Sequence, residues 1–95
     1  MLKVVAKMSF TPEAKDSALP LVKELVAATV QEKGCLGYNF CQQAESTDAY
    51  AMIESWETPE ALDAHMKSEH FTTILPQISA LGKGETEIAV FEVLV

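Results

Sequence analysis

Residues 54–71, ESWETPEALDAHMKSEHF, contain the end of a strand and the start of a helix within a few positions. The segment 50–56 that leads into them alternates between the two sides of an extended chain. One face of this segment carries Tyr50, Met52, Glu54 and Trp56. Thr58 can then accept an unpaired backbone N–H, and Pro59 suits the first position of a helix. The stretch therefore predicts a strand that passes directly into a helix.

His65 lies on the inward side of this predicted helix, because Leu62 and Met66 share its face at helical spacing. The strand before it ends at Trp56. We therefore expect the imidazole of His65 and the indole of Trp56 to meet at one wall of the core, on two sides of an enclosed space.

The other predicted elements follow from the same periodicities. Strands are expected at 2–10, 35–43, 50–57 and 86–95, and helices from Thr11 toward Gly34, at 59–67 and at 69–81. Pro20 lies inside the first helix, where its missing N–H predicts either a kink or a later helix start.

The element order β-α-β-β-α-β predicts an α+β, ferredoxin-like fold: a four-stranded antiparallel sheet with the helices on one face. The last strand is apolar on both sides from Ile88 onward, apart from Glu92, which is typical of a sheet covered on both faces. The hydrophobic content is 48%, high for 95 residues. We therefore expect a single domain, residues 1–95, that forms a homodimer of the α/β-barrel type through its bare sheet face.

The net charge is −7, and all seven cationic residues are Lys. A chain without Arg has no bidentate group for phosphates or base edges, so we expect neither nucleic-acid nor membrane binding. Cys35 and Cys41 should lie about 20 Å apart along one strand, too far for a disulfide. Free thiols predict a reducing compartment, and we expect a cytoplasmic location.

Three segments resemble the antibiotic biosynthesis monooxygenase domain: MLKVVAKMSF at 1–10, EKGCLGY at 32–38 and MIESWETPEALDAHMKSEHF at 52–71. The most specific element is E-x-W, followed nine residues later by His and then by S-x-H-F. The resemblance implies a dimer of ferredoxin-like subunits, each with a pocket between sheet and helices. Some members of that family oxygenate phenols or quinols without metal or flavin, whereas others degrade haem, isomerise small metabolites or have no known activity.

Two branches of the family fit poorly. The haem-degrading branch has an Asn on its first strand, which this chain lacks, and His65 and Leu75 stand where that branch has Trp and His. The polyketide-oxidising branch has Asn and Tyr where this chain has Met52 and Leu62. The chain is most similar to the quinol-monooxygenase-like group, which has a similar GC-x-GY and E-x-W…H…H pattern.

His65 is the candidate catalytic base, because an imidazole titrates near neutral pH and can deprotonate a hydroquinone. The alternative is a core histidine bonded to a backbone carbonyl or to Glu54. Glu54 is the candidate partner that orients His65, or else a structural hydrogen-bonding group near the helix start. Trp56 is expected either to line the pocket or to anchor the core.

Tyr38, Phe71 and His70 complete the candidate substrate-binding residues. His70 lies about 140° around a continuous helix from His65, so only a break near Ser68 would bring the two rings together. No third ligand is evident beside the two histidines, and we therefore expect no metal and no cofactor.

The expected function is that of a cofactor-independent monooxygenase that oxidises a small hydroquinone or phenol with dioxygen. Two alternatives use the same pocket: a non-catalytic dimer that binds a small aromatic or quinol-like molecule, and an isomerase or lyase that acts on a small oxygenated metabolite. Consumption of dioxygen distinguishes the first function from both alternatives.

Overall fold

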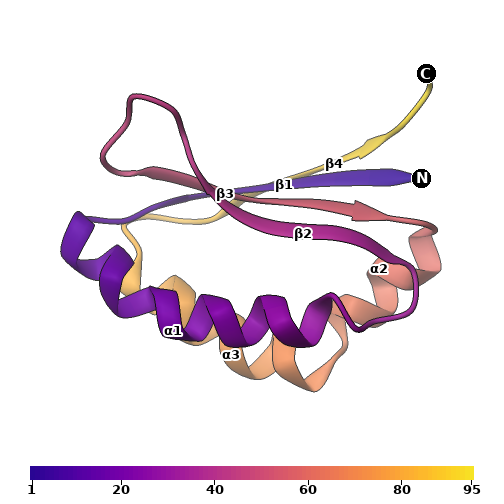
Figure 1. Ribbon diagram of the computed structural model, residues 1–95, viewed down its shortest axis with the longest axis horizontal. Coiled ribbons are helices and arrows are strands. Elements are labelled where there is room, and N and C mark those ends of the chain that lie inside the picture. Colours follow the sequence, from indigo (N-terminus) through magenta and orange to yellow (C-terminus); the bar gives the residue numbers. More distant parts are fainter.

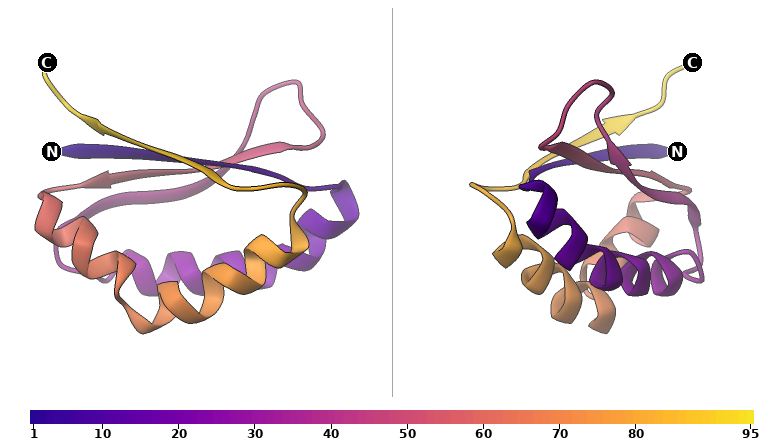
Figure 2. Two further views of the ribbon diagram at one scale, coloured as in Figure 1. Left: turned by 180° about the vertical axis from the view of Figure 1, so that it is seen from behind. Right: turned by 60° about the vertical axis from the view of Figure 1, so that its left-hand side comes forward.

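Helices cover one face of a four-stranded antiparallel sheet in the computed structural model, which describes residues 1–95 (Figures 1 and 2). The order of strands across the sheet is β2-β3-β1-β4. The elements in chain order are β1 (Leu2–Ser9), α1 (Pro12–Thr29), β2 (Cys35–Gln42), β3 (Ala49–Trp56), α2 (Pro59–Met66), α3 (Glu69–Leu81) and β4 (Glu87–Glu92). The ferredoxin-like fold expected from the sequence is confirmed.

The strand alternation read from the sequence builds the core. The buried residues of the two central strands are Leu2, Val4, Ala6 and Met8 in β1 and Tyr50, Met52, Glu54 and Trp56 in β3. Because β1 pairs with both β3 and β4, Val4 lies between Glu54 and Val90. This register puts one carboxyl group, that of Glu54, into an otherwise apolar region of the helix-covered face.

Helix α1 begins at Pro12, capped by the Thr11 hydroxyl, and runs through Pro20 without interruption. The predicted later start is therefore wrong. Pro20 and Asp16 are both exposed, so the carbonyl that loses its N–H partner lies on the solvent side of the helix. The helix ends at Thr29, before Gly34, and residues 30–34 form a turn. None of the helices combines the length and apolar character needed to span a membrane.

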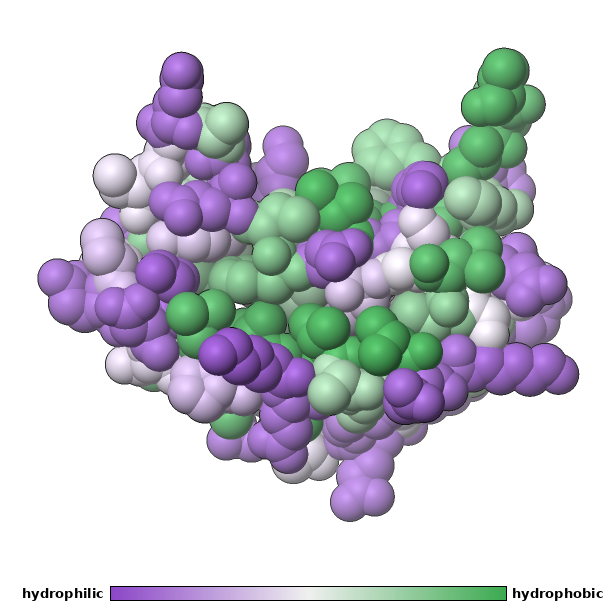
Figure 3. Space-filling model, in the orientation of Figure 1, coloured by the Kyte–Doolittle hydropathy of each residue, from purple (hydrophilic) through white to green (hydrophobic).

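Strand β4 is shorter than predicted and exposed along its whole length. Its apolar residues Ile88, Val90 and Phe91 are each more than half exposed. The apolar side chains after β4 also lie at the surface, and Figure 3 shows them as a strongly hydrophobic projection at the upper right, where the chain ends. Burial of both faces of this strand, which the sequence pattern predicts, is absent within one chain.

Candidate active site

The break between α2 and α3 brings His65 and His70 together. The Ser68 hydroxyl accepts from the Phe71 N–H at 3.3 Å, which caps α3, and donates to the His65 carbonyl at 2.6 Å. The chain turns at this point, and the centroids of the two imidazole rings lie 6.1 Å apart. The break near Ser68, which the sequence analysis requires for the two rings to come together, is therefore present.

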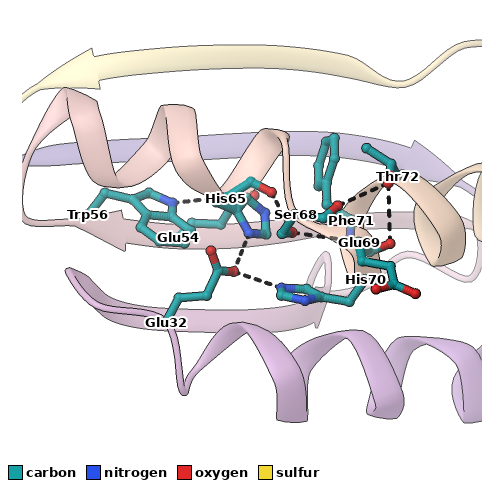
Figure 4. Close-up of polar contacts among 9 residues, drawn as sticks. All are labelled: Glu32, Glu54, Trp56, His65, Ser68, Glu69, His70, Phe71 and Thr72. Carbon is teal, nitrogen blue, oxygen red and sulfur yellow. Dashed lines mark hydrogen bonds and ion pairs between the residues drawn. The ribbon is translucent and has the colours of Figure 1, made fainter.

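Glu32 bridges the two histidines (Figure 4). Its Oε2 lies 2.6 Å from Nδ1 of His65 and 2.8 Å from Nε2 of His70. The prediction that Glu54 orients His65 is wrong, because Glu32 holds that place. Sequence reasoning missed Glu32, which comes from the turn between α1 and β2 and belongs to no periodic pattern.

The position of Glu32 depends on Gly34, two residues later. Gly34 has a φ of +86°, and a Cβ at this position would lie 2.5 Å from the Cβ of Ala61 in α2. The Gly34 carbonyl also accepts from the Glu57 N–H at 2.8 Å. Only glycine allows this conformation and this approach without strain, and the turn that carries Glu32 thereby packs against the start of α2.

A carboxylate only accepts hydrogen bonds, so both histidines donate an N–H to Glu32. In neutral His65 the proton is then on Nδ1, and Nε2 carries a free lone pair. His65 is 1% exposed, and its buried Nε2 has no hydrogen-bond partner. Burial lowers the pKa of His65, although the bond to Glu32 opposes this effect. A neutral imidazole with one nitrogen oriented and the other free is suited to accept a proton.

His65 lines a cavity of about 50 Å³ between the sheet and helices α2 and α3, with β4 on one side. Apolar side chains form most of its wall. The predicted site residues on this wall are Tyr38, Glu54, His65 and Phe71. Met66 also lines the cavity, although it is 43% exposed and so not buried on the inward stripe as expected.

Trp56 lies outside this cavity, which corrects the prediction that it lines the pocket. Its indole packs directly on His65, with ring centroids 4.7 Å apart and planes at 34°, and it is completely buried. No enclosed space separates the two rings, contrary to expectation. Tyr38 and Phe71 meet the same imidazole edge-on, at 5.3 and 4.9 Å. Trp56 is therefore a core anchor that supports one face of His65, and the space available to a ligand is elsewhere around this ring.

Glu54 is a buried carboxyl group on the cavity wall, and its Oε1 accepts from Nε1 of Trp56 at 2.9 Å (Figure 4). Burial raises the pKa of Glu54 to about 7, the charge of Glu32 adds to this effect, and the Trp56 bond opposes it. Burial, followed by the charges of Glu54 and Glu32, also raises the pKa of Tyr38. Near neutral pH the cavity thus presents a neutral phenol and a carboxyl group that is partly protonated.

His70 does not reach the cavity, although it was predicted to contact substrate. It lines a separate surface groove with Glu24, Glu69 and Thr73. Together with Glu32 and His65 it offers one ligand atom to a common point, and these atoms lie within 4.8 Å of one another. The sequence makes no third ligand evident beside the two histidines, and in the structure Glu32 supplies one.

The fold and the cavity define a small ferredoxin-like protein with a candidate active site between its sheet and its helices. Residues 1–77 match the antibiotic biosynthesis monooxygenase family, and the chain belongs to this family.

Two solved structures are similar over nearly the whole chain. A conserved protein from Methanosarcina mazei Go1 is 36% identical, with a TM-score of 0.91 over 95% of this chain and 89% of that one. A crystal structure described as antibiotic biosynthesis monooxygenase is 37% identical, with a TM-score of 0.90 over 100% of both chains.

Two relatives found by comparison of sequences are less similar to this chain. Probable quinol monooxygenase YgiN of Escherichia coli K12 is 29% identical over 74% of this chain and 77% of its own length. An uncharacterised protein of Synechocystis is 21% identical over 95% of this chain, which spans 61% of that protein's length.

Proposed function

We propose that this protein is a cofactor-independent monooxygenase that oxidises a small hydroquinone or phenol with dioxygen, with His65 as the base. The observation that carries the proposal is the free Nε2 of a buried imidazole on the wall of an apolar cavity, while Nδ1 is held by Glu32. Membership of the antibiotic biosynthesis monooxygenase family and the distant similarity to YgiN support the same reading.

The reaction needs no external reductant. His65 Nε2 takes the proton of a substrate hydroxyl, and the resulting aromatic anion transfers one electron to dioxygen. The substrate radical and superoxide then combine at a ring carbon, the resulting peroxide anion takes the proton back from His65 Nε2, and the hydroperoxide loses water to leave a carbonyl group. Overall, hydroquinone and dioxygen give hydroxyquinone and water, with all electrons and hydrogens supplied by the substrate. Proton abstraction by a positioned base typically contributes about 10²–10⁴-fold to the rate.

Glu54 and Tyr38 have supporting roles in this proposal. Because the pKa of Glu54 is raised to about 7, its carboxyl group is partly protonated at neutral pH and can donate to the second oxygen of the substrate. The neutral Tyr38 hydroxyl offers another donor on the same wall. Few polar groups on an apolar wall are typical of sites that orient a small aromatic ligand.

Substrate entry requires the cavity to widen. Its volume of about 50 Å³ is smaller than the roughly 150 Å³ that accommodates a benzene ring in a protein interior. Its wall includes the flexible side chains of Met8, Met52 and Met66, and the exposed Ile88 and Val90 of β4. We expect the ligand to enter between α2 and β4, where these side chains yield most easily.

The uncovered face of the sheet fits a second copy of the chain. Val5 pairs with Ile53 and with Ala89, so the three share the face away from the helices, and Phe91 belongs to the same face. Ile53 and Phe91 are 44% and 54% exposed, and a homodimer through this face would bury them.

Since β1 lies between β3 and β4, both halves of the chain share one sheet, and we propose that residues 1–95 form one domain.

The test is oxygen uptake with 1,4-naphthohydroquinone as the model substrate, corrected for its spontaneous oxidation without protein. The variants are His65→Ala and His65→Gln, with Glu57→Gln as control because Glu57 is exposed and close to Trp56. We expect the His65 variants to lose at least 100-fold in rate and the control to keep its rate. Circular dichroism checks that each variant is folded.

Equal oxygen uptake by the parent and the His65 variants would remove the base from the proposal. Binding detected by thermal shift without oxygen uptake would support a non-catalytic binding module instead. Conversion of a substrate without dioxygen would support an isomerase or lyase.

A further inference from the structure

The cluster of Glu32, His65 and His70 has more ligating groups than a base with its partner needs. Glu32 alone fixes the tautomer of His65, yet His70 donates to the same Oε2. Two imidazole nitrogens and one carboxylate oxygen thus converge, with all three ligand atoms within 4.8 Å of one another. Two His and one carboxylate are a ligand set of catalytic zinc sites and of other divalent-metal sites.

We propose that Glu32, His65 and His70 bind one divalent cation of the zinc type, and that the cation switches off His65 as a base. The inhibitory part of this inference rests on the proposed function, because it concerns the same imidazole. The binding part does not.

Coordination requires a shift of the Glu32 carboxylate and a closer approach of the two histidine nitrogens, which lie within 4.8 Å of each other and would stand about 3.3 Å apart on a tetrahedral cation. Ligand atoms about 2.0–2.1 Å from a tetrahedral cation stand roughly 3.3 Å from one another. The present separations of 2.6 and 2.8 Å are those of N–H···O bonds, so Glu32 has to retreat by less than about 1 Å from each histidine. Glu32 lies in a turn, and a flexible side chain carries its carboxylate, so such a shift of the carboxylate is easy.

The surroundings favour a cation. His70 is 22% exposed and lines a surface groove, which gives the cluster access to solvent and to a water ligand. Glu24 and Glu69 line the same groove, and the chain carries a net charge of −7. A cation therefore approaches through a negative region, by way of the groove that His70 lines and not through the apolar cavity.

Coordination changes the tautomer of His65. A neutral imidazole that binds a cation through Nδ1 keeps its proton on Nε2. Nε2 then becomes a hydrogen-bond donor and can no longer accept the substrate proton. Bound zinc is therefore expected to lower the rate without occupying the cavity.

Binding is tested with cobalt(II), whose visible absorption reports tetrahedral coordination, on protein that carries no affinity tag and has been dialysed against a chelator. Zinc affinity follows from displacement of the cobalt. The ligand variants are His70→Gln and Glu32→Gln, with Glu57→Gln as the control, because Glu57 is exposed and belongs neither to the cluster nor to the groove. We expect one equivalent to bind to the parent and the control, and affinity to fall at least about 100-fold in each ligand variant, since loss of a mere supporting contact already costs 10–100-fold.

Absence of saturable binding at one equivalent would overturn the site. Binding that persists in both ligand variants would also overturn it, as would a cobalt–thiolate charge-transfer band, which would assign the cation to Cys35 or Cys41.

The inhibitory part is tested by oxygen uptake: one equivalent of zinc should lower the rate of the parent, a chelator should restore it, and the rate of His70→Gln should not respond. Binding without inhibition would overturn this part alone. If the parent consumes no oxygen, the proposed function fails while the cobalt titration still decides the site.

Discussion

The indole N–H of Trp56 donates to the Glu54 carboxyl group two residues earlier, and both side chains lie on the buried face of β3. This bond is the only one found for the Glu54 side chain, and it stabilises the ionised form. Trp56→Phe removes the donor and leaves a cavity beside His65. We expect the pKa of Glu54 to rise above 7 and the unfolding free energy to fall by about 2 kcal/mol. Carboxyl-carbon NMR titration and thermal unfolding measure the two effects, and an unchanged Glu54 titration would contradict the first.

Glu54 also makes stability depend on pH. It keeps its proton up to about pH 7 in the folded protein but releases it near its ordinary value of 4.5 when unfolded. Between these values the folded state binds more protons, so this group lowers the unfolding free energy as pH rises, by up to about 3 kcal/mol. The Glu54→Gln variant lacks this titrating proton. The unfolding free energy of the variant minus that of the parent should therefore increase as the pH rises from 4.5 to 7. Urea unfolding at several pH values measures this, with the exposed Glu57→Gln as control; a constant difference would refute it.

The turn that carries Glu32 offers a comparison between two glycines with positive φ. Gly34→Ala would place a methyl group 2.5 Å from the Cβ of Ala61, whereas Gly84→Ala meets no atom within 4 Å. Both substitutions place a residue with a Cβ at a positive φ, which lowers the unfolding free energy by about 1 kcal/mol. Only Gly34→Ala must also displace the turn from α2, so we expect it to lose at least about 1 kcal/mol more and to weaken the Glu32–His65 contact. Thermal unfolding of the two variants tests this, and equal losses would show that the contact with Ala61 is easily relieved.

The open face of the sheet supplies a test of self-association. Phe91→Glu puts a charge on edge strand β4, within the proposed dimer contact, and is expected to yield a monomer. Leu81→Glu changes a residue that is also exposed, at 36%, but lies at the end of α3 on the helical side. We expect this control to keep the mass of the parent. Light scattering after gel filtration measures the masses, and a parent that is itself monomeric would remove the dimer from the proposal.

The sheet and the helix starts could be predicted because they follow from local chemistry. Alternation assigned the buried faces of β1 and β3, and the Thr-Pro pairs at Thr11 and Thr58 located the starts of α1 and α2. The site was only half predictable. The strand-to-helix junction does bring Trp56 and His65 together, but whether two rings touch or enclose a space depends on side chains from the whole core. Glu32 is 33 residues from His65 in sequence and lies in a turn, where no periodicity indicates the direction of a side chain.

The packing of the single tryptophan on His65 gives the protein a built-in optical reporter. An imidazolium quenches indole fluorescence more strongly than a neutral imidazole, and the emission of Trp56 should follow the state of that one neighbouring ring. Protonation, the proposed ligand and the proposed cation would each act on His65, so we expect each to change the intrinsic emission of the unmodified chain.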